Sequence, residues 1–258
     1  MATIWQSPPS FVIIMKIAAL SDIHGNLAAL DAVLADIRSA GADLIVNLGD
    51  ILSGALFPRE TADRLMPLGL PTIRGNHERQ VLAGDRERMG QSDRWALDCL
   101  RPDQFDWIAG LPSTLSIGED VLLVHGTPVD DLTYFLETVT CSGCREATSD
   151  EVERRAGTVT SKLILCGHTH LQRSRRLDDG RLIVNPGSVG LQAYEDDRPF
   201  PHRMEMGSPH ARYAFVTRIG SEWTVQFRAV EYDWDAASAT ATANGRHDWA
   251  VALRSGRC

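Results

Sequence analysis

Seven side chains with nitrogen or oxygen donors follow short apolar runs of the chain, usually with a glycine nearby. Four are imidazoles, two are carboxylates and one is an amide. This mixture suits Mn, Fe, Zn, Ni or Co better than Mg or Ca. Because a single tetrahedral site uses fewer ligands, the set indicates two divalent cations that share a bridging group. The candidate metal ligands are Asp22, His24, Asp50, Asn76, His125, His168 and His170.

Such a centre is suited to chemistry at phosphorus. Two cations roughly 3.5 to 4 Å apart acidify a bridging water and hold the oxygens of an in-line displacement. Asp50 is the expected catalytic bridge, since a carboxylate has two oxygens and Gly49 gives it room. His77 is expected to protonate the leaving oxygen or to stabilise its charge. Arg74 and Asn76 are expected to contact the substrate, although a surface ion pair is an equally good interpretation of Arg74.

The apolar runs before these side chains have the length and β-branched content of buried strands. Loops at the carboxyl ends of parallel strands meet at one edge of a sheet, so the donors are expected to converge there. A helix is expected from 27 to the closing Gly41, and weaker helical patterns cover 59–66, 93–100 and 146–156. The expected strands are 16–20, 43–48, 70–73, 121–124, 163–166, 182–184, 213–216 and 223–230.

Strand and helix alternate in the first half, and strands follow one another in the second, which is typical of an α/β domain with mixed sheets. We expect one domain over 1–258, with 1–14 as a peripheral leader and 236–258 as a tail or helix. The segment 127–160 shows no clear strand and is interpreted as an insertion over one face. Cys141 and Cys144 form a lone CxxC pair there, for which a polar loop is the expected setting.

The composition limits which partners the protein can bind and indicates the cellular compartment in which it is expected. The chain has 258 residues, 43% of them hydrophobic, and a formal net charge of −8, which argues against stable nucleic-acid binding. The five cysteines are scattered and odd in number, as in reduced cytoplasmic proteins. The apolar stretch 11–20 is too short to span a membrane and has no positive region before it. His202, His210 and His247 lie in polar stretches and are expected at the surface.

Five short motifs in order resemble those of the calcineurin-like metallophosphoesterases. The motif His125-Gly-Thr-Pro128 and the run 185–190 resemble motifs of the small bacterial and archaeal phosphodiesterase branch. The resemblance spans roughly 15–232. The five motifs are Asp22-Ile-His24, Gly49-Asp50, Gly75-Asn76-His77-Glu78, His125 and Gly167-His168-Thr-His170.

The resemblance implies a four-layer α/β/β/α sandwich of two mixed sheets flanked by helices. It implies His77 as the catalytic histidine, where many members of the phosphodiesterase branch have a cysteine. Ser53 and Gly54 stand where the family's protein phosphatases have Asp and Arg. The implied ligands are Asp22, His24, Asp50 and His170 for one metal and Asp50, Asn76, His125 and His168 for the other.

The favoured function is a metal-dependent hydrolysis of phosphodiesters or phosphomonoesters, with Mn as the favoured cation and a small phosphoester, such as a nucleotide, as substrate. A dinucleoside polyphosphate hydrolase and a protein phosphatase are alternatives, because dinucleoside polyphosphates and phosphoproteins would present the same phosphorus to such a site. A scaffold without catalysis on the same fold is the alternative from another class. The complete donor set favours the enzyme, because a scaffold needs neither Asp50 nor His77.

Overall fold

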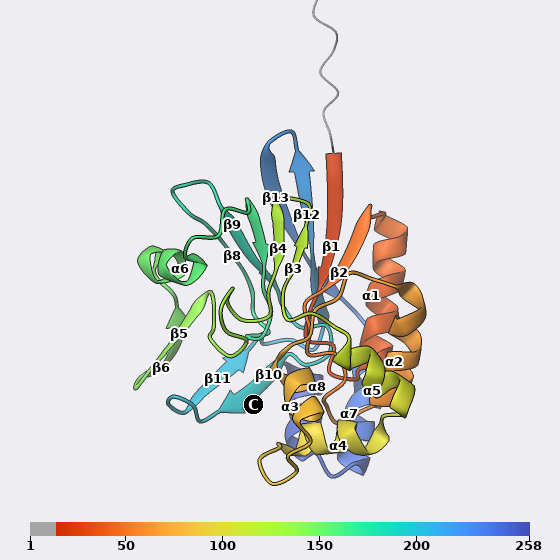
Figure 1. Ribbon diagram of the computed structural model, residues 1–258. Coiled ribbons are helices and arrows are strands. Elements are labelled where there is room, and N and C mark those ends of the chain that lie inside the picture. Colours follow the sequence, from red (N-terminus) through yellow and green to blue (C-terminus); the bar gives the residue numbers. More distant parts are fainter. Residues whose placement is uncertain (1–13) are drawn as a thin grey trace, which may run out of the picture.

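The computed structural model describes residues 14–258, and its centre is a pair of sheets packed face to face (Figure 1). Helices cover the outer face of one sheet, and a helix with a short hairpin covers the outer face of the other. This arrangement confirms the expected four-layer sandwich of mixed sheets. The expected leader, 1–14, falls almost wholly outside the described residues.

The first sheet has the strand order β13-β12-β1-β2. Its strands are β1 (Ile14–Leu20), β2 (Leu44–Asn47), β12 (Ala211–Ile219) and β13 (Glu222–Val230). β1 and β2 are parallel and are connected by α1 (Leu27–Ala40), whereas β12 pairs antiparallel with both β1 and β13. Parallel pairing places the carboxyl ends of β1 and β2 at the same edge.

The second sheet has the order β3-β4-β7-β9-β8. Its strands are β3 (Leu115–Ile117), β4 (Val121–Leu123), β7 (Leu163–Leu165), β8 (Gln172–Arg176) and β9 (Leu182–Pro186). β4, β7 and β9 run parallel, while β3 and β8 are antiparallel at the two edges. The parallel centre of this sheet therefore also sends its carboxyl ends in one direction.

Apolar side chains alternate between the two faces of β1 and hold the layers together. Ile17 and Ala19 point into the core between the sheets, whereas Ala18 and Leu20 face α1. Each of these four side chains is fully buried. Burial on both faces explains why this strand is a continuous apolar run.

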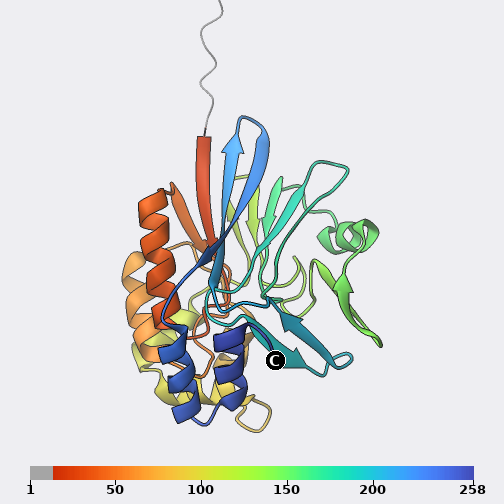
Figure 2. The same cartoon turned by 180° about the vertical axis from the view of Figure 1, so that it is seen from behind.

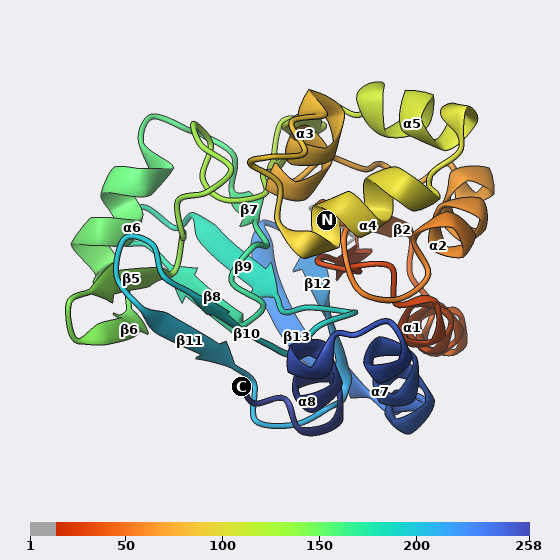
Figure 3. The same cartoon turned by 90° about the horizontal axis from the view of Figure 1, so that it is seen from below.

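Shorter elements surround the edge where the parallel strands end (Figures 1 and 3). Figure 2 shows the C-terminal helices, in dark blue, at the same end of the molecule. None of the helices in the described part is long and apolar enough to cross a membrane. The remaining elements are α2 (Pro58–Leu65), η1 (Met66–Leu68), α3 (Asn76–Ala83), α4 (Gln91–Cys99), α5 (Pro102–Ala109), β5 (Glu137–Thr140), β6 (Gly143–Glu146), α6 (Ser149–Ala156), β10 (Ala193–Asp196), β11 (His202–Glu205), α7 (Trp234–Ala243) and α8 (His247–Ser255).

Some local expectations were wrong. The run 70–73 makes only an isolated bridge between Thr72 and Asn47, because Pro71 has no N–H to extend a ladder. The segment 127–160 contains the hairpin β5–β6. His202 is buried, at 6% exposure, and lies 2.9 Å from the Tyr134 hydroxyl. The C-terminal region is helical, as one of its two interpretations proposed.

Candidate metal centre and catalytic cleft

The loops that follow β1 and β2 are joined by backbone hydrogen bonds. The Asp22 N–H donates to the Gly49 carbonyl and the His24 N–H to the Asp50 carbonyl, each at 3.0 Å. The loop after β7 joins them, because the His168 N–H lies 3.2 Å from both Asp22 carboxylate oxygens. Residues far apart in sequence are thereby held at one edge of the two sheets.

The backbone at these loops is unusual. Within residues 14–258, five residues other than glycine have positive φ, and all five are predicted metal ligands. Such a conformation costs an L residue about 1 kcal/mol or more and persists only where the surroundings enforce it. Strain restricted to the donors indicates a functional site. The five are Asp22 (54°), His24 (51°), Asp50 (53°), His168 (70°) and His170 (61°).

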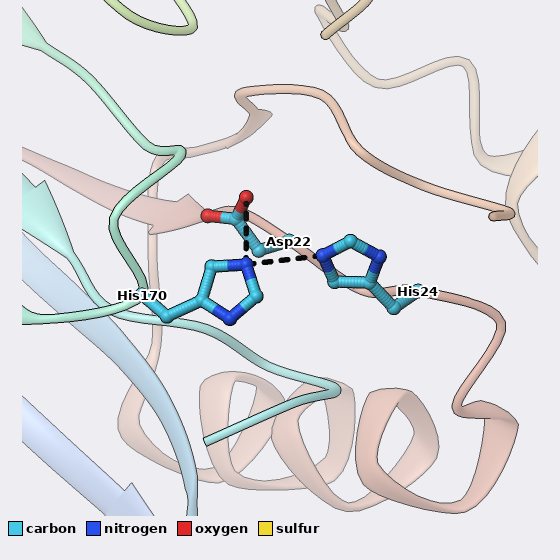
Figure 4. Close-up of side chains that lie close together, drawn as sticks. All are labelled: Asp22, His24 and His170. Carbon is cyan, nitrogen blue, oxygen red and sulfur yellow. Dashed lines mark hydrogen bonds and ion pairs between the residues drawn. The ribbon is translucent and has the colours of Figure 1, made fainter. Parts of the chain in front are cut away.

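The first cluster consists of Asp22, His24 and His170 (Figure 4). His24 Nδ1 lies 2.6 Å from the Ser53 carbonyl and His170 Nδ1 lies 2.7 Å from the Leu191 carbonyl, so both Nδ1 atoms carry the hydrogen. The two Nε2 lone pairs then face each other at 3.1 Å, with an Asp22 oxygen 3.5 Å from His170 Nε2. Facing lone pairs repel, and a cation between them removes the repulsion.

The second cluster consists of Asp50, His125 and His168, with Asn76 beside them. The Asn76 amide oxygen is 3.1 Å from His125 Nε2 and 3.1 Å from His168 Nδ1, and 3.3 Å from an Asp50 oxygen. The Asn76 oxygen, a hydrogen-bond acceptor, therefore lies beside two imidazole nitrogens and a carboxylate oxygen, each of which can also act as an acceptor. This arrangement fits a cation, which would accept electron pairs from all four.

Backbone carbonyls orient both histidines of this cluster. His125 Nδ1 lies 2.7 Å from the Leu48 carbonyl, and His168 Nε2 lies 3.0 Å from the Leu132 carbonyl. In each ring the nitrogen bonded to a carbonyl leaves the other nitrogen facing the cluster. The seven predicted donors therefore lie together, and their role as metal ligands stays a prediction.

Asp50 is buried among the donors of the second cluster. One of its oxygens is 3.1 Å from His125 Nε2, and the other accepts the His77 N–H at 3.0 Å. Burial raises the pKa of Asp50, but the charges of His125 and His77 outweigh it and hold this pKa well below its usual range. The same pairing raises the pKa of His125 to about 10 although burial lowers it. A proton and a cation would compete for this pair.

His24 and His168 have pKa values below the ordinary value for histidine. Burial lowers the pKa of His24 to about 3, and the neighbouring His170 acts in the same direction. Burial, followed by the charge of His125, lowers the pKa of His168 to about 4. Both rings are therefore neutral at pH 7, which is the form that binds metals.

Two glycines are required by close approach. A Cβ on Gly75 would lie 2.2 Å from an Asp50 oxygen, and one on Gly167 would lie 2.0 Å from the Ser21 hydroxyl. Real Cβ contacts are never this short, so any side chain at either position would displace a donor loop.

Glu78 is a residue whose role the sequence did not reveal. It is 1% exposed, and one carboxylate oxygen accepts the Asp50 N–H (2.9 Å) and the Gly75 N–H (2.9 Å). The other accepts the N–H groups of Ile51 (2.8 Å) and Leu52 (3.4 Å). Glu78 therefore ties the start of α3 to the loop that carries Asp50.

His77 lies at the start of α3 and has a carboxylate partner from α4. Its Nδ1 lies 2.6 Å from an oxygen of Asp93, which also accepts a hydrogen bond from the Ser53 hydroxyl. Its Nε2 lies 3.9 Å from an Asp50 oxygen. Burial lowers the pKa of His77, but Asp50 and Asp93 outweigh it and raise the pKa to about 9. Asp93 is a second functional residue that the sequence did not reveal.

The centre lies in an open cleft of about 1910 Å³. Its lining residues come from helical segments, including α8, and from Tyr134 and the strand β10. Arg74 is half-buried and is not among the lining residues of the described chain, which include Arg88 and Arg246. A substrate contact by Arg74 stays a prediction.

A donor set at the strand ends of two facing mixed sheets suits two cations that act on a phosphoester. Residues 15–200 match the model of the calcineurin-like phosphoesterase superfamily domain. The chain belongs to the calcineurin-like phosphoesterase superfamily.

Individual relatives resemble nearly the whole chain. The uncharacterized protein MJ0912 of Methanocaldococcus jannaschii is 25% identical over 251 residues, which cover 90% of this chain and 94% of the relative. The crystal structure of a metallophosphoesterase from Sphaerobacter thermophilus superposes with a TM-score of 0.73 at 24% identity, covering 94% of this chain and 99% of the other. At that identity the second likeness supports the fold alone.

Proposed function

We propose that the protein hydrolyses phosphoesters, with phosphodiesters as the preferred substrates, at a centre that binds two divalent cations. The observation that carries the proposal is the pair of donor clusters in which acceptor atoms face acceptor atoms. In the first cluster the facing Nε2 lone pairs of His24 and His170 repel each other unless a cation lies between them. Superfamily membership supports phosphoester chemistry at the same centre.

The donor residues would divide between two cations. Asp22, His24 and His170 would hold one, and Asn76, His125 and His168 the other, with Asp50 between them. When bound, the cations would lower the pKa of a water molecule and neutralise charge on the phosphoryl oxygens. Mixed nitrogen and oxygen donors suit Mn, Fe, Zn, Ni or Co, and Mn is the cation that we favour.

His77 would act on the leaving oxygen. Its Nδ1 is held by Asp93, so Nε2 is the atom free to give a hydrogen bond or a proton. Asp93 acts through His77 by fixing the ring, and Ser53 in turn fixes Asp93. Protonation of the leaving oxygen would therefore need no histidine other than His77.

The shape of the cleft favours diesters. Its lining includes Trp249, whose ring meets that of His24 in the first cluster, and Tyr134, whose ring meets that of His168 in the second. A phosphodiester carries a substituent on each side of phosphorus, whereas a monoester would leave one side empty. Nucleotides fit this description.

The scattered cysteines support a reducing, cytoplasmic setting for the reaction.

The test is a comparison of rates. Metal-free protein is reconstituted with Mn, Ni, Zn or Mg and assayed with bis-p-nitrophenyl phosphate, p-nitrophenyl phosphate and a nucleotide panel. We expect the highest kcat/KM for a diester with Mn. Asp50→Asn should abolish turnover, while the exposed control Asp31→Asn should keep it. No hydrolysis with any metal would favour a scaffold.

A further inference from the structure

One surface loop joins the two imidazoles of the second cluster. It comprises residues 127–133 and begins shortly after His125, which follows β4. The carbonyl of Leu132, an exposed residue of this loop, lies 3.0 Å from His168 Nε2. This contact keeps the hydrogen of the His168 ring on Nε2 and leaves Nδ1 to face the cluster. The orientation of His168 therefore depends on how the loop is folded.

The Asp130 carboxylate determines the fold of this loop. One of its oxygens accepts the N–H groups of Leu132 (2.6 Å) and Thr133 (2.7 Å). The Leu132 carbonyl and the Thr133 N–H belong to the same planar peptide group. When Asp130 holds that N–H, it also fixes the direction in which the carbonyl points, which is toward His168. The Thr127 N–H closes the loop by donating to the Asp130 carbonyl at 2.7 Å.

The loop is also tied to the helix that supplies another donor of the second cluster. The Arg79 guanidinium donates to both Asp131 carboxylate oxygens, at 2.7 and 2.8 Å. Arg79 lies about one turn after Asn76 in α3. The carbonyls that orient the histidines of the first cluster belong instead to Ser53 and Leu191. The loop is therefore expected to act on the second cluster and not on the first.

We propose that Asp130 is a positioning residue for the second cation: it directs the Leu132 carbonyl at His168 and thereby sets the affinity of the second cluster. The inference rests on the proposed function, because it requires a cation at that cluster. Loss of the partner that orients a metal-binding imidazole typically lowers cation affinity by roughly 10- to 100-fold. Asp130 acts through the carbonyl and does not touch the ring, so its loss should have an effect near the lower end.

Two measurements that start from metal-free protein at pH 7 test the proposal. Nitrogen NMR of the imidazoles shows which nitrogen of His168 carries the hydrogen, and the variant His168→Gln identifies the signals of that ring. Calorimetric titration with Mn measures the affinity of each binding event. Asp130→Ala should leave His168 in a mixture of tautomers and weaken one binding event by about tenfold, with the other unchanged. Asp130→Asn should stay close to the unmodified protein, because an amide oxygen can accept both N–H groups.

Asp179→Ala is the matched control. The Asp179 carboxylate also accepts the N–H group two residues further on, that of Arg181, at 3.0 Å. It lies in the turn between β8 and β9, at the amino end of β9 and so away from the edge where the donors meet. Its loss should lower the midpoint of urea unfolding and leave both Mn affinities unchanged.

Arg79→Met provides a second variant that leaves Asp130 in place. It releases the loop from α3 and should weaken the same binding event as Asp130→Ala. The expected loss is smaller, about two- to fivefold, because ion pairs between partly exposed side chains contribute little.

The outcomes separate the two proposals. Unchanged affinities in Asp130→Ala, or equal losses at both binding events, would overturn the role of Asp130 while leaving cation binding intact. The same holds if His168 keeps one tautomer in Asp130→Ala. If the unmodified protein binds no Mn, the proposed function fails and this inference fails with it.

Discussion

Replacing Glu78 with Gln tests how the loop that carries Asp50 is held. Glu78 accepts four backbone N–H groups, two on each carboxylate oxygen. An amide nitrogen cannot accept a hydrogen bond, so one of the two pairs must break. The less costly orientation turns the nitrogen toward Ile51 and Leu52, because the Leu52 contact is already long at 3.4 Å.

The magnitude follows from those bonds. A hydrogen bond to a charged group contributes about 1.5 to 3 kcal/mol, so loss of the Ile51 bond and the weak Leu52 bond predicts about 2 to 4 kcal/mol. Burial and the charge of Asp50 raise the pKa of Glu78, so removing the Glu78 charge relieves some repulsion. The expected loss of unfolding free energy is therefore near the lower end, about 2 kcal/mol.

Urea unfolding of the metal-free protein at pH 7 measures this loss, and calorimetric titration with Mn measures cation affinity. Mn affinity should fall as well, because Asp50 is no longer held by its backbone. Glu60→Gln is the control, since Glu60 is exposed in the first turn of α2. Unfolding free energies that are equal in Glu78→Gln and the unmodified protein would refute the role assigned to Glu78.

Asp93→Ala should release the His77 ring and lower kcat by about 10- to 100-fold for substrates with alkyl leaving groups. The loss should be smaller for substrates that release p-nitrophenol. Steady-state rates that fall equally for both kinds of substrate would contradict a role of Asp93 through His77. Chelation with EDTA should lower the melting temperature, and Mn at 100 times its Kd should restore about 2.7 kcal/mol per site; a melting temperature that ignores both treatments would contradict cation binding by the folded chain. The hydrogen bond from Arg228 lowers the pKa of Asp36. Burial raises this pKa, but the hydrogen bond from Tyr213 also lowers it, and the net shift is downward. Asp36 thus stabilises the fold above its unfolded-state pKa of about 3.9, and this contribution is lost as the pH falls through the lower folded-state value. Asp36→Asn should therefore cost less than about 1 kcal/mol at pH 7 and still less at pH 2, as measured by urea midpoints; an equal cost at both would contradict the ion pair.

The sequence was sufficient to predict that these side chains lie together, because each strand that ends at the centre is a short apolar run followed at once by a polar side chain. Asp22 follows β1 and His125 follows β4 almost directly, so the rule for parallel strands placed them correctly. Helix α1 was predicted from its periodicity and its closing Gly41.

The partners of those donors could not be predicted in this way. Asp93 reaches His77 only because α3 and α4 pack together, and nothing in their separation of sixteen residues signals that contact. Glu78 was visible in its motif, but the N–H groups that it accepts belong to another loop. Helix α5 was missed because its eight residues, beginning at Pro102, make little more than two turns, which is too short to show a period.

The most direct test of the central claim is anomalous X-ray diffraction from crystals of the unmodified protein soaked in Mn. The account predicts two peaks about 3.5 to 4 Å apart, one contacted by His24 and His170 and the other by His125 and His168, with Asp50 touching both. A single peak, or two peaks that do not share Asp50, would contradict it.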